Sequence, residues 1–170
     1  MSNTPSSNAS ASSHELRALA RRWFVRVWNQ KNAATIDEMM APNCVIHGLS
    51  EERETMRGPA QFRRFYDPLR SAFPDIHIEV EDVLLDGRQT AARILATGTH
   101  TGEGLGIPPT GRPVRASGII IMRWDDGGRI VEGWNEFDAA GMQRQLMTPA
   151  TPAVARSSRP QRDRRRRWRH

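Results

Sequence analysis

The sequence predicts an α+β domain in which helices come first and an antiparallel sheet follows. Apolar residues recur every three to four positions early in the chain, as they do on one face of a helix. After residue 75 the apolar period shortens to two, which is typical of strands with one buried face. Asp86-Gly87 is a strong hairpin signal between two such segments. Together these observations favour a curved antiparallel sheet wrapped around three N-terminal helices.

Three helices are expected before residue 75. Ser12 and Glu15 have the spacing of a capping box, which begins a helix over residues 13–30. A short second helix follows, and a third begins at Gly58. Pro68 lies inside the third helix and is expected to kink or split it, because proline lacks the backbone donor that a helix uses.

One short strand is expected before the third helix and four longer strands after it. The long segments are rich in Ile, Val, Leu, Thr and Trp, and turn residues separate them. The expected strands are residues 44–47, 76–85, 88–101, 113–124 and 129–137.

Composition divides the chain into one folded domain, residues 14–147, and two polar ends. Residues 1–13 and 148–170 contain little that could be buried, so both ends are expected to be disordered. The chain has 25 basic and 19 acidic residues, for a net charge of +6. Residues 151–170 contain eight Arg and one Asp, so this tail alone carries more than the whole net charge.

Several protein classes are unsupported by the sequence. Cys44 is the only cysteine, so neither an intramolecular disulfide nor a CxxC motif can form. The N-terminus shows no signal-peptide pattern, and no apolar run approaches the roughly 18 residues of a membrane helix. A cytoplasmic location is therefore expected. Nucleic acid is a possible partner only through the Arg-rich tail, and a solvated extension is the favoured reading of that tail.

Two segments carry a family resemblance. Gly98–Arg112 resembles the loop signature of SnoaL-like polyketide cyclases, including the ester cyclases, and Gly128–Asp138 resembles their final strand, with Trp134 four residues before Asp138. The resemblance extends over residues 14–147. It implies the cone-shaped, nuclear-transport-factor-2-like fold, a ligand inside the cone and a homodimer through the outer face of the sheet. It also implies ring closure by intramolecular aldol condensation, with no metal and no organic cofactor.

The resemblance makes Asp138 the expected acid–base group. Strand alternation places Glu132, Trp134, Glu136 and Asp138 on one face, which is expected to face the pocket. Burial in an apolar pocket would raise the pKa of the Asp138 carboxyl toward a useful range. The alternative is that Asp138 caps the helix that follows the strand.

Two histidines are expected to assist Asp138. His100 could donate a hydrogen bond to a substrate carbonyl or enolate oxygen, or it could be a structural residue that ties the glycine-rich loop. The resemblance turns His47 toward the cavity, although a lone His on an apolar strand is more often a core residue. No spacing typical of metal ligands connects His47, His100 and Asp138, so no metal site is expected.

Four further residues are expected to contact the substrate, namely Trp28, Tyr66, Trp134 and Glu136. Three of them are aromatic, which suits a flat, conjugated ligand. The sequence therefore predicts a cofactor-free cyclase that acts on a hydrophobic, polyketide-like carbonyl substrate. The alternatives are an isomerase, dehydratase or epoxide hydrolase on the same cone, or a non-catalytic binding or dimerisation module.

Overall fold

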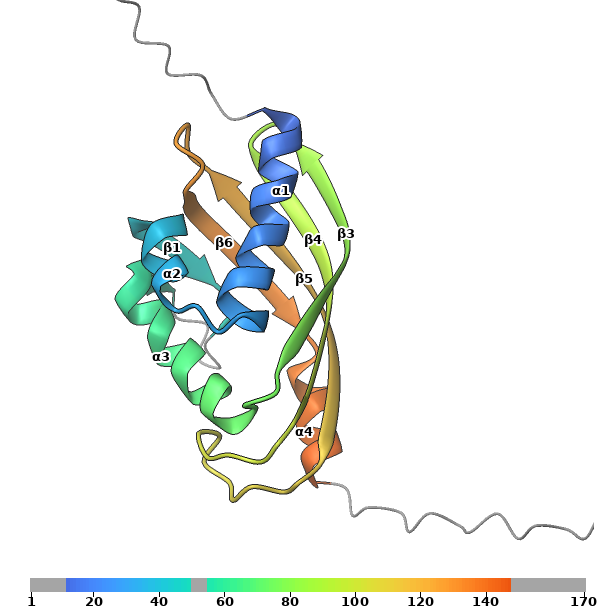
Figure 1. The fold of residues 1–170 in the computed structure, drawn as a ribbon. Coiled ribbons are helices and arrows are strands. Elements are labelled where there is room, and N and C mark those ends of the chain that lie inside the picture. Colours follow the sequence, from blue (N-terminus) through green and yellow to red (C-terminus); the bar gives the residue numbers. More distant parts are fainter. Residues whose placement is uncertain (1–11, 50–54, 148–170) are drawn as a thin grey trace, which may run out of the picture.

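A curved sheet of six strands, with helices against its concave face, forms the framework of the protein (Figure 1). The computed structural model describes residues 12–49 and 55–147. The strand order is β2-β1-β6-β5-β4-β3. The strands are β1 (Met40–His47), β2 (Met56–Arg57), β3 (His77–Asp86), β4 (Gln89–Thr99), β5 (Pro113–Trp124) and β6 (Ile130–Phe137). The expected α+β class is confirmed.

Three of the four α-helices precede the long strands. They are α1 (Ser13–Trp23), α2 (Ala34–Met39) and α3 (Gly58–Ala72), and α4 (Ala139–Met147) follows the sheet. The capping box of α1 is confirmed, since the Glu15 amide donates to Ser12 Oγ (3.3 Å) and the Ser12 amide donates to Glu15 Oε2 (2.6 Å).

Pro68 was expected to kink or split the third helix, and the split is wrong. Helix α3 runs without interruption from Gly58 to Ala72 and includes Pro68. Proline costs the helix one internal hydrogen bond. Phe62, Tyr66 and Ala72 of the same helix are buried in the core, and this packing offsets the loss.

The sheet is antiparallel except at one pair of strands. The hairpin at Asp86-Gly87 is confirmed, because Asp86 of β3 pairs with Gln89 of β4, and β5 and β6 continue the antiparallel order. Strand β1, however, runs parallel to β6, which departs from the fully antiparallel expectation. The local sequence patterns of the two strands carry no signal of this pairing, because the strands lie some 90 residues apart in the chain.

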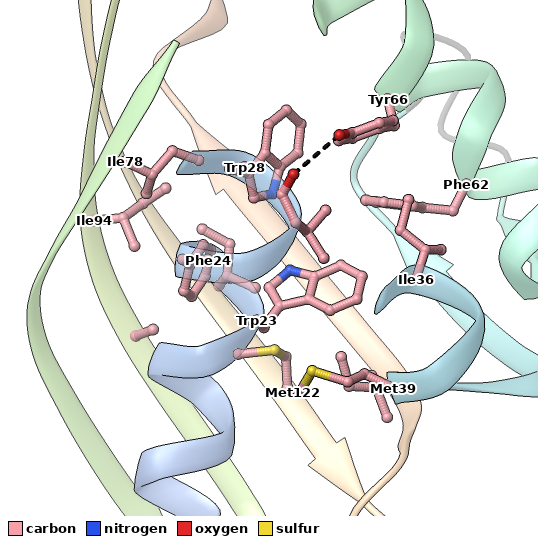
Figure 2. Close-up of a cluster of buried hydrophobic side chains, with 14 of the residues drawn as sticks. Trp23, Phe24, Trp28, Ile36, Met39, Phe62, Tyr66, Ile78, Ile94 and Met122 are labelled. Atoms are coloured by element: carbon pink, nitrogen blue, oxygen red, sulfur yellow. Dashed lines mark hydrogen bonds between the residues drawn. The ribbon is translucent and has the colours of Figure 1, made fainter. Parts of the chain in front are cut away.

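An aromatic layer on the helices packs against the concave face of the sheet (Figure 2). The rings of Trp23 and Phe62 lie 5.5 Å apart, and those of Trp28 and Tyr66 lie 5.1 Å apart. Each large apolar side chain that is fully buried contributes roughly 1.5–3 kcal/mol. This layer therefore supplies much of the free energy that holds the helices to the sheet.

A π-helical segment, η1 (Phe24–Asn29), continues α1. Its wider turns pair residues five apart, as in the bond from the Gln30 amide to the Val25 carbonyl (2.8 Å). The Val27 carbonyl instead accepts a buried hydrogen bond from the Tyr66 hydroxyl (2.9 Å; Figure 2). The expected helix over residues 13–30 is therefore present, but its last turns are π rather than α.

The side chain of Asn29 joins the end of η1 to the edge strand β3. Asn29 Oδ1 accepts from the Ile78 amide (2.7 Å), and Asn29 Nδ2 donates to the Ile78 carbonyl (2.9 Å). One side chain thus satisfies both backbone groups of an edge residue, as a neighbouring strand would.

Some of the expectations concern residues that the structure does not describe. The ends expected to be disordered lie outside the described residues, apart from Ser12 and Ser13, and so does the Arg-rich tail. Among the described helices, none has both the length and the apolar character that crossing a membrane requires.

Replacing Asn29 with Ala is expected to lower the free energy of unfolding by about 2 kcal/mol, because a part-buried amide and a carbonyl lose their partner together. Urea denaturation measures this difference. Replacing the neighbouring, exposed Gln30 with Ala serves as the control and is expected to change stability by less than about 0.5 kcal/mol. Equal midpoints for the two variants would contradict the pairing role of Asn29.

Candidate ligand cavity

A cavity of about 120 Å³ lies between the helices and the concave face of the sheet. For comparison, an apolar cavity of about 150 Å³ holds a benzene molecule. The residues that line this cavity are overwhelmingly aliphatic or aromatic, and they come from both layers. They include Trp23, Phe24, Trp28, Phe62, Phe65, Leu69 and Phe73 from the helical side, and Ile46, Ile78, Ile94, Ala116, Ile120, Met122 and Gly133 from the strands.

Polar side chains are scarce in this wall. Among the described residues that line the cavity, Thr97 and Asn135 are the only ones with a hydroxyl or an amide, and none carries a titratable group. Asn135 Nδ2 donates to the His47 carbonyl (2.9 Å), which fixes the amide at the junction of β6 and β1. Asn135 therefore offers a guest an amide whose orientation is fixed by the backbone of β1.

Strand β6 turns the other set of residues toward the cavity than the sequence had suggested. Gly133, Asn135 and Phe137 line the cavity, whereas Trp134 and Glu136 belong to the opposite, outer face of the sheet. The expected alternation is present, but its direction is inverted. A period of two shows which residues share a face and does not show which face is inside. The expectation that Trp134 and Glu136 line the cavity is wrong.

Asp138 lies at the N-terminus of α4 and is exposed to solvent. Its Oδ1 accepts a hydrogen bond from the Gly141 amide (2.7 Å), and its backbone carbonyl accepts from the Met142 amide (3.0 Å). This is the geometry of an N-cap residue, which was the alternative reading of Asp138. The carboxylate is not part of the cavity wall.

His100 is completely buried at the end of β4, with its ring against Phe73 (5.4 Å between ring centroids). Its Nδ1 accepts from the Thr110 amide (3.3 Å) and lies 3.2 Å from the Thr110 hydroxyl. Its backbone bonds to Arg112 and Gly111, which close the base of the glycine-rich loop. His100 thus ties this loop, and it is not part of the cavity wall, although Phe73 beside it is.

His47 belongs to a polar cluster on the outer face of the sheet. Its ring stacks on Trp134 (5.4 Å between centroids), and its Nε2 lies 3.0 Å from Glu132 Oε1. The second oxygen of Glu132 pairs with Arg123. Hydrogen bonds from His47 and Arg123 lower the pKa of the Glu132 carboxyl from its usual value. The structure therefore does not bring His47, His100 and Asp138 together around the cavity.

The two remaining aromatic candidates take different positions. Trp28 lines the cavity, as expected. Tyr66 is not part of the cavity wall. It packs edge-on against Trp28, and its hydroxyl donates to the Val27 carbonyl. Cys44 is also buried, and burial raises the pKa of its thiol to about 12, so it would remain protonated at neutral pH.

Sequence reasoning missed two residues of the cavity wall that matter for chemistry, Asn135 and Gly133. The signal for both was available, because they alternate with Trp134 along β6. Within residues 12–49 and 55–147, no three His, Cys, Asp or Glu side chains gather as metal ligands would.

Comparison with known protein families identifies the family of this chain. The family model described as SnoaL-like polyketide cyclase matches residues 18–146. The chain belongs to the SnoaL-like polyketide cyclase family. The match covers both segments in which the sequence resembled these proteins and every element from the body of α1 to the body of α4.

Individual relatives agree with this membership. The SnoaL-like chain is 30% identical over 132 residues to the aklanonic acid methyl ester cyclase DauD of Streptomyces sp. (strain C5), covering 77% of this chain and 81% of DauD. The structure of IdmH from Streptomyces antibioticus, a proposed polyketide cyclase, is 31% identical with a TM-score of 0.68, covering 79% of this chain and all of IdmH. AclR from Streptomyces galilaeus, a proposed hydroxylase, is 28% identical with a TM-score of 0.70, covering 79% of this chain and 97% of AclR.

If Asp138 caps α4 in this SnoaL-like chain, its replacement by Asn and by Ala should affect stability differently. Asp138→Asn keeps an oxygen that can cap α4 and is expected to leave stability within about 0.5 kcal/mol, whereas Asp138→Ala is expected to lose about 1 kcal/mol. Thermal unfolding of the two variants measures the difference. If both variants were as stable as the parent, the capping role would be excluded.

Proposed function

We propose that this chain is a cyclase whose hydrophobic, carbonyl-bearing, polyketide-like substrate places its closing ring in the cavity under the aromatic layer. The observation that carries the proposal is the cavity itself, in whose wall Thr97 and Asn135 alone carry a hydroxyl or an amide among the described residues, and the amide of Asn135 on β6 is held by the His47 carbonyl. Membership of the family and the ester cyclases among the relatives support the choice of reaction.

Positioning is the main contribution that such a wall can make. Ring closure within one molecule requires a flexible chain to hold its reacting carbons close together, and a shaped cavity removes that freedom before the reaction. Trp23, Trp28 and Phe62 offer flat apolar surfaces for conjugated rings.

The amide of Asn135 would bind the oxygen on which charge develops. An aldol closure joins an enolate carbon to a carbonyl carbon, while one proton leaves the first carbon and one joins the new alkoxide. An amide hydrogen directed at the enolate oxygen lowers the cost of that charge in an apolar site. The carbon between two carbonyl groups is already acidic, so in this proposal water at the mouth of the cavity accepts its proton, and the resulting hydronium or another water returns one proton to the new alkoxide.

The acid–base roles expected for Asp138, His100 and His47 find little support in their positions. Asp138 caps a helix, His100 ties a loop, and His47 lies on the outer face. A direct proton transfer would need one of these groups within about 3 Å of the reacting atom. The Asp138→Asn variant, which is expected to keep its fold, also tests this role, since unchanged turnover would exclude Asp138 as the base.

The proposal is tested with aklanonic acid methyl ester as the trial substrate, since the relative DauD is named for it. Ring closure leaves the mass unchanged and alters the chromatographic retention, which makes the product easy to follow. Asn135→Leu is expected to lower kcat/KM about tenfold or more, equivalent to about 1.4 kcal/mol, because the enolate oxygen loses its donor.

The matched control is Trp134→Phe, the next residue of β6, which belongs to the outer face and is expected to keep kcat/KM within about twofold. Urea denaturation of both variants separates lost chemistry from lost fold, because Asn135→Leu also removes the bond to the His47 carbonyl. A full rate for a folded Asn135→Leu variant would remove Asn135 from the mechanism.

A binding module without chemistry is the second candidate. The observation that favours it is the lack of a titratable side chain among the described residues of the cavity wall. The two functions differ in one readout, because a binding module would bind the ester tightly and return it unchanged.

A further inference from the structure

We propose that Gly133 forms the floor of a ligand subsite, a bay in the cavity wall that accepts one flat apolar ring whose edge carries an oxygen. The inference rests on the proposed function, because it states how that function's ligand would lie. It starts from a glycine whose presence neither backbone conformation nor crowding explains.

Gly133 is buried in the middle of β6 and lines the cavity. Its backbone is not in the positive-φ region. A Cβ built on Gly133 would meet a single atom within 4 Å, the Ile121 carbonyl oxygen at 3.8 Å. By contrast, a Cβ on Gly118 of β5 would lie 2.9 Å from the Glu136 carbonyl oxygen, so that position is too crowded for a side chain.

Glycine is costly inside a strand, because it adds freedom to the unfolded chain and leaves nothing to pack. At Gly133 a side chain would fit without strain and would fill part of the cavity. The missing side chain therefore keeps open a volume that the protein itself does not use. A close approach of a ligand to the backbone is one of the recognised reasons for a glycine in a strand.

The neighbours of Gly133 define the sides of the bay. Gly133 pairs with Ile46 of β1 on one side and with Met122 of β5 on the other, and both line the cavity. These two residues are two strand spacings apart, about 10 Å between backbones. A ring that enters between them would rest on the exposed peptide groups of Gly133. Trp23 of α1 lines the same cavity from the helical side.

Asn135 indicates which substituent the bound ring would carry at its edge. It lies two residues along β6 on the same face, about 7 Å from Gly133 between Cα atoms. The bond to the His47 carbonyl uses one of its two amide hydrogens. In the described part of the chain, no other partner of this amide is found, so the second hydrogen and Oδ1 are available to a keto or hydroxyl oxygen. The subsite thus fits a phenol or quinone ring.

The test uses p-cresol as the probe and toluene as the matched ligand without the oxygen, with binding to the full chain followed by NMR shift titration. The parent is expected to bind p-cresol more tightly than toluene. Gly133→Ala is expected to weaken p-cresol binding about tenfold, and Gly133→Leu to abolish measurable binding. The thermal midpoints of both variants are expected to equal or exceed that of the parent, because the glycine penalty is removed.

Ala91→Val is the control variant, since it adds methyl groups to β4 at a position that does not line the cavity, and it is expected to bind p-cresol as the parent does. If Gly133→Ala and Gly133→Leu bind p-cresol unchanged while the parent cyclises its substrate, the subsite is overturned and the proposed function stands. If the Gly133 variants lose binding but the parent cyclises nothing, the subsite stands and the cyclase proposal fails. A parent that binds no p-cresol overturns the subsite, and its turnover then decides the proposed function separately.

Discussion

The contact between the aromatic layer of the helices and the concave face of the sheet governs the rest of this structure. Trp23 of α1 and Phe24 and Trp28 of η1 belong to this layer, and Phe62 of α3 packs against Trp23. The strands curve beneath this layer (Figure 1), and a cavity of about 120 Å³ remains between the two. The same contact thus supplies cohesion and leaves an apolar hollow.

The two faces of the sheet divide the chemistry of the protein. The concave face is apolar except for a few groups, and the outer face carries the cluster of His47, Glu132 and Arg123. Polar and charged groups keep their hydration where water can reach them. In an apolar hollow they lose that hydration, and the loss is unfavourable unless every group is hydrogen-bonded. The position of the cluster of His47, Glu132 and Arg123 on the outer face therefore follows from desolvation. The proposed cyclase relies accordingly on shape and on one oriented amide.

Local features of the fold could be predicted because short-range patterns carry them. The capping box at Ser12, the hairpin at Asp86-Gly87 and the change of period after residue 75 all appear in the structure. The parallel pairing of β1 with β6 could not be predicted from local sequence patterns, because it depends on contacts between distant segments. The inside and outside of β6 were assigned the wrong way round because Trp134 and Phe137 are both large and apolar, so hydrophobicity alone could not choose between the faces. Asn135 was missed for the same reason, whereas the family resemblance through the glycine-rich loop was a long and specific pattern and is confirmed.

The π-helical turns after α1 make the direction of Trp28 depend on the length of the chain. A π turn holds about one residue more than an α turn, so each residue after it is rotated by roughly 100° from its direction in an uninterrupted α-helix. Loss of a single residue between Phe24 and Asn29 would let the segment wind as an ordinary helix. The indole of Trp28 and the amide of Asn29 would then keep nearly their present directions, because the deletion removes the one residue that the π turns add. The full-length segment wound entirely as α-helix would instead turn Trp28 by roughly 100°, away from the hollow, so the π turns let this segment hold one more residue without moving the side chains that line the cavity.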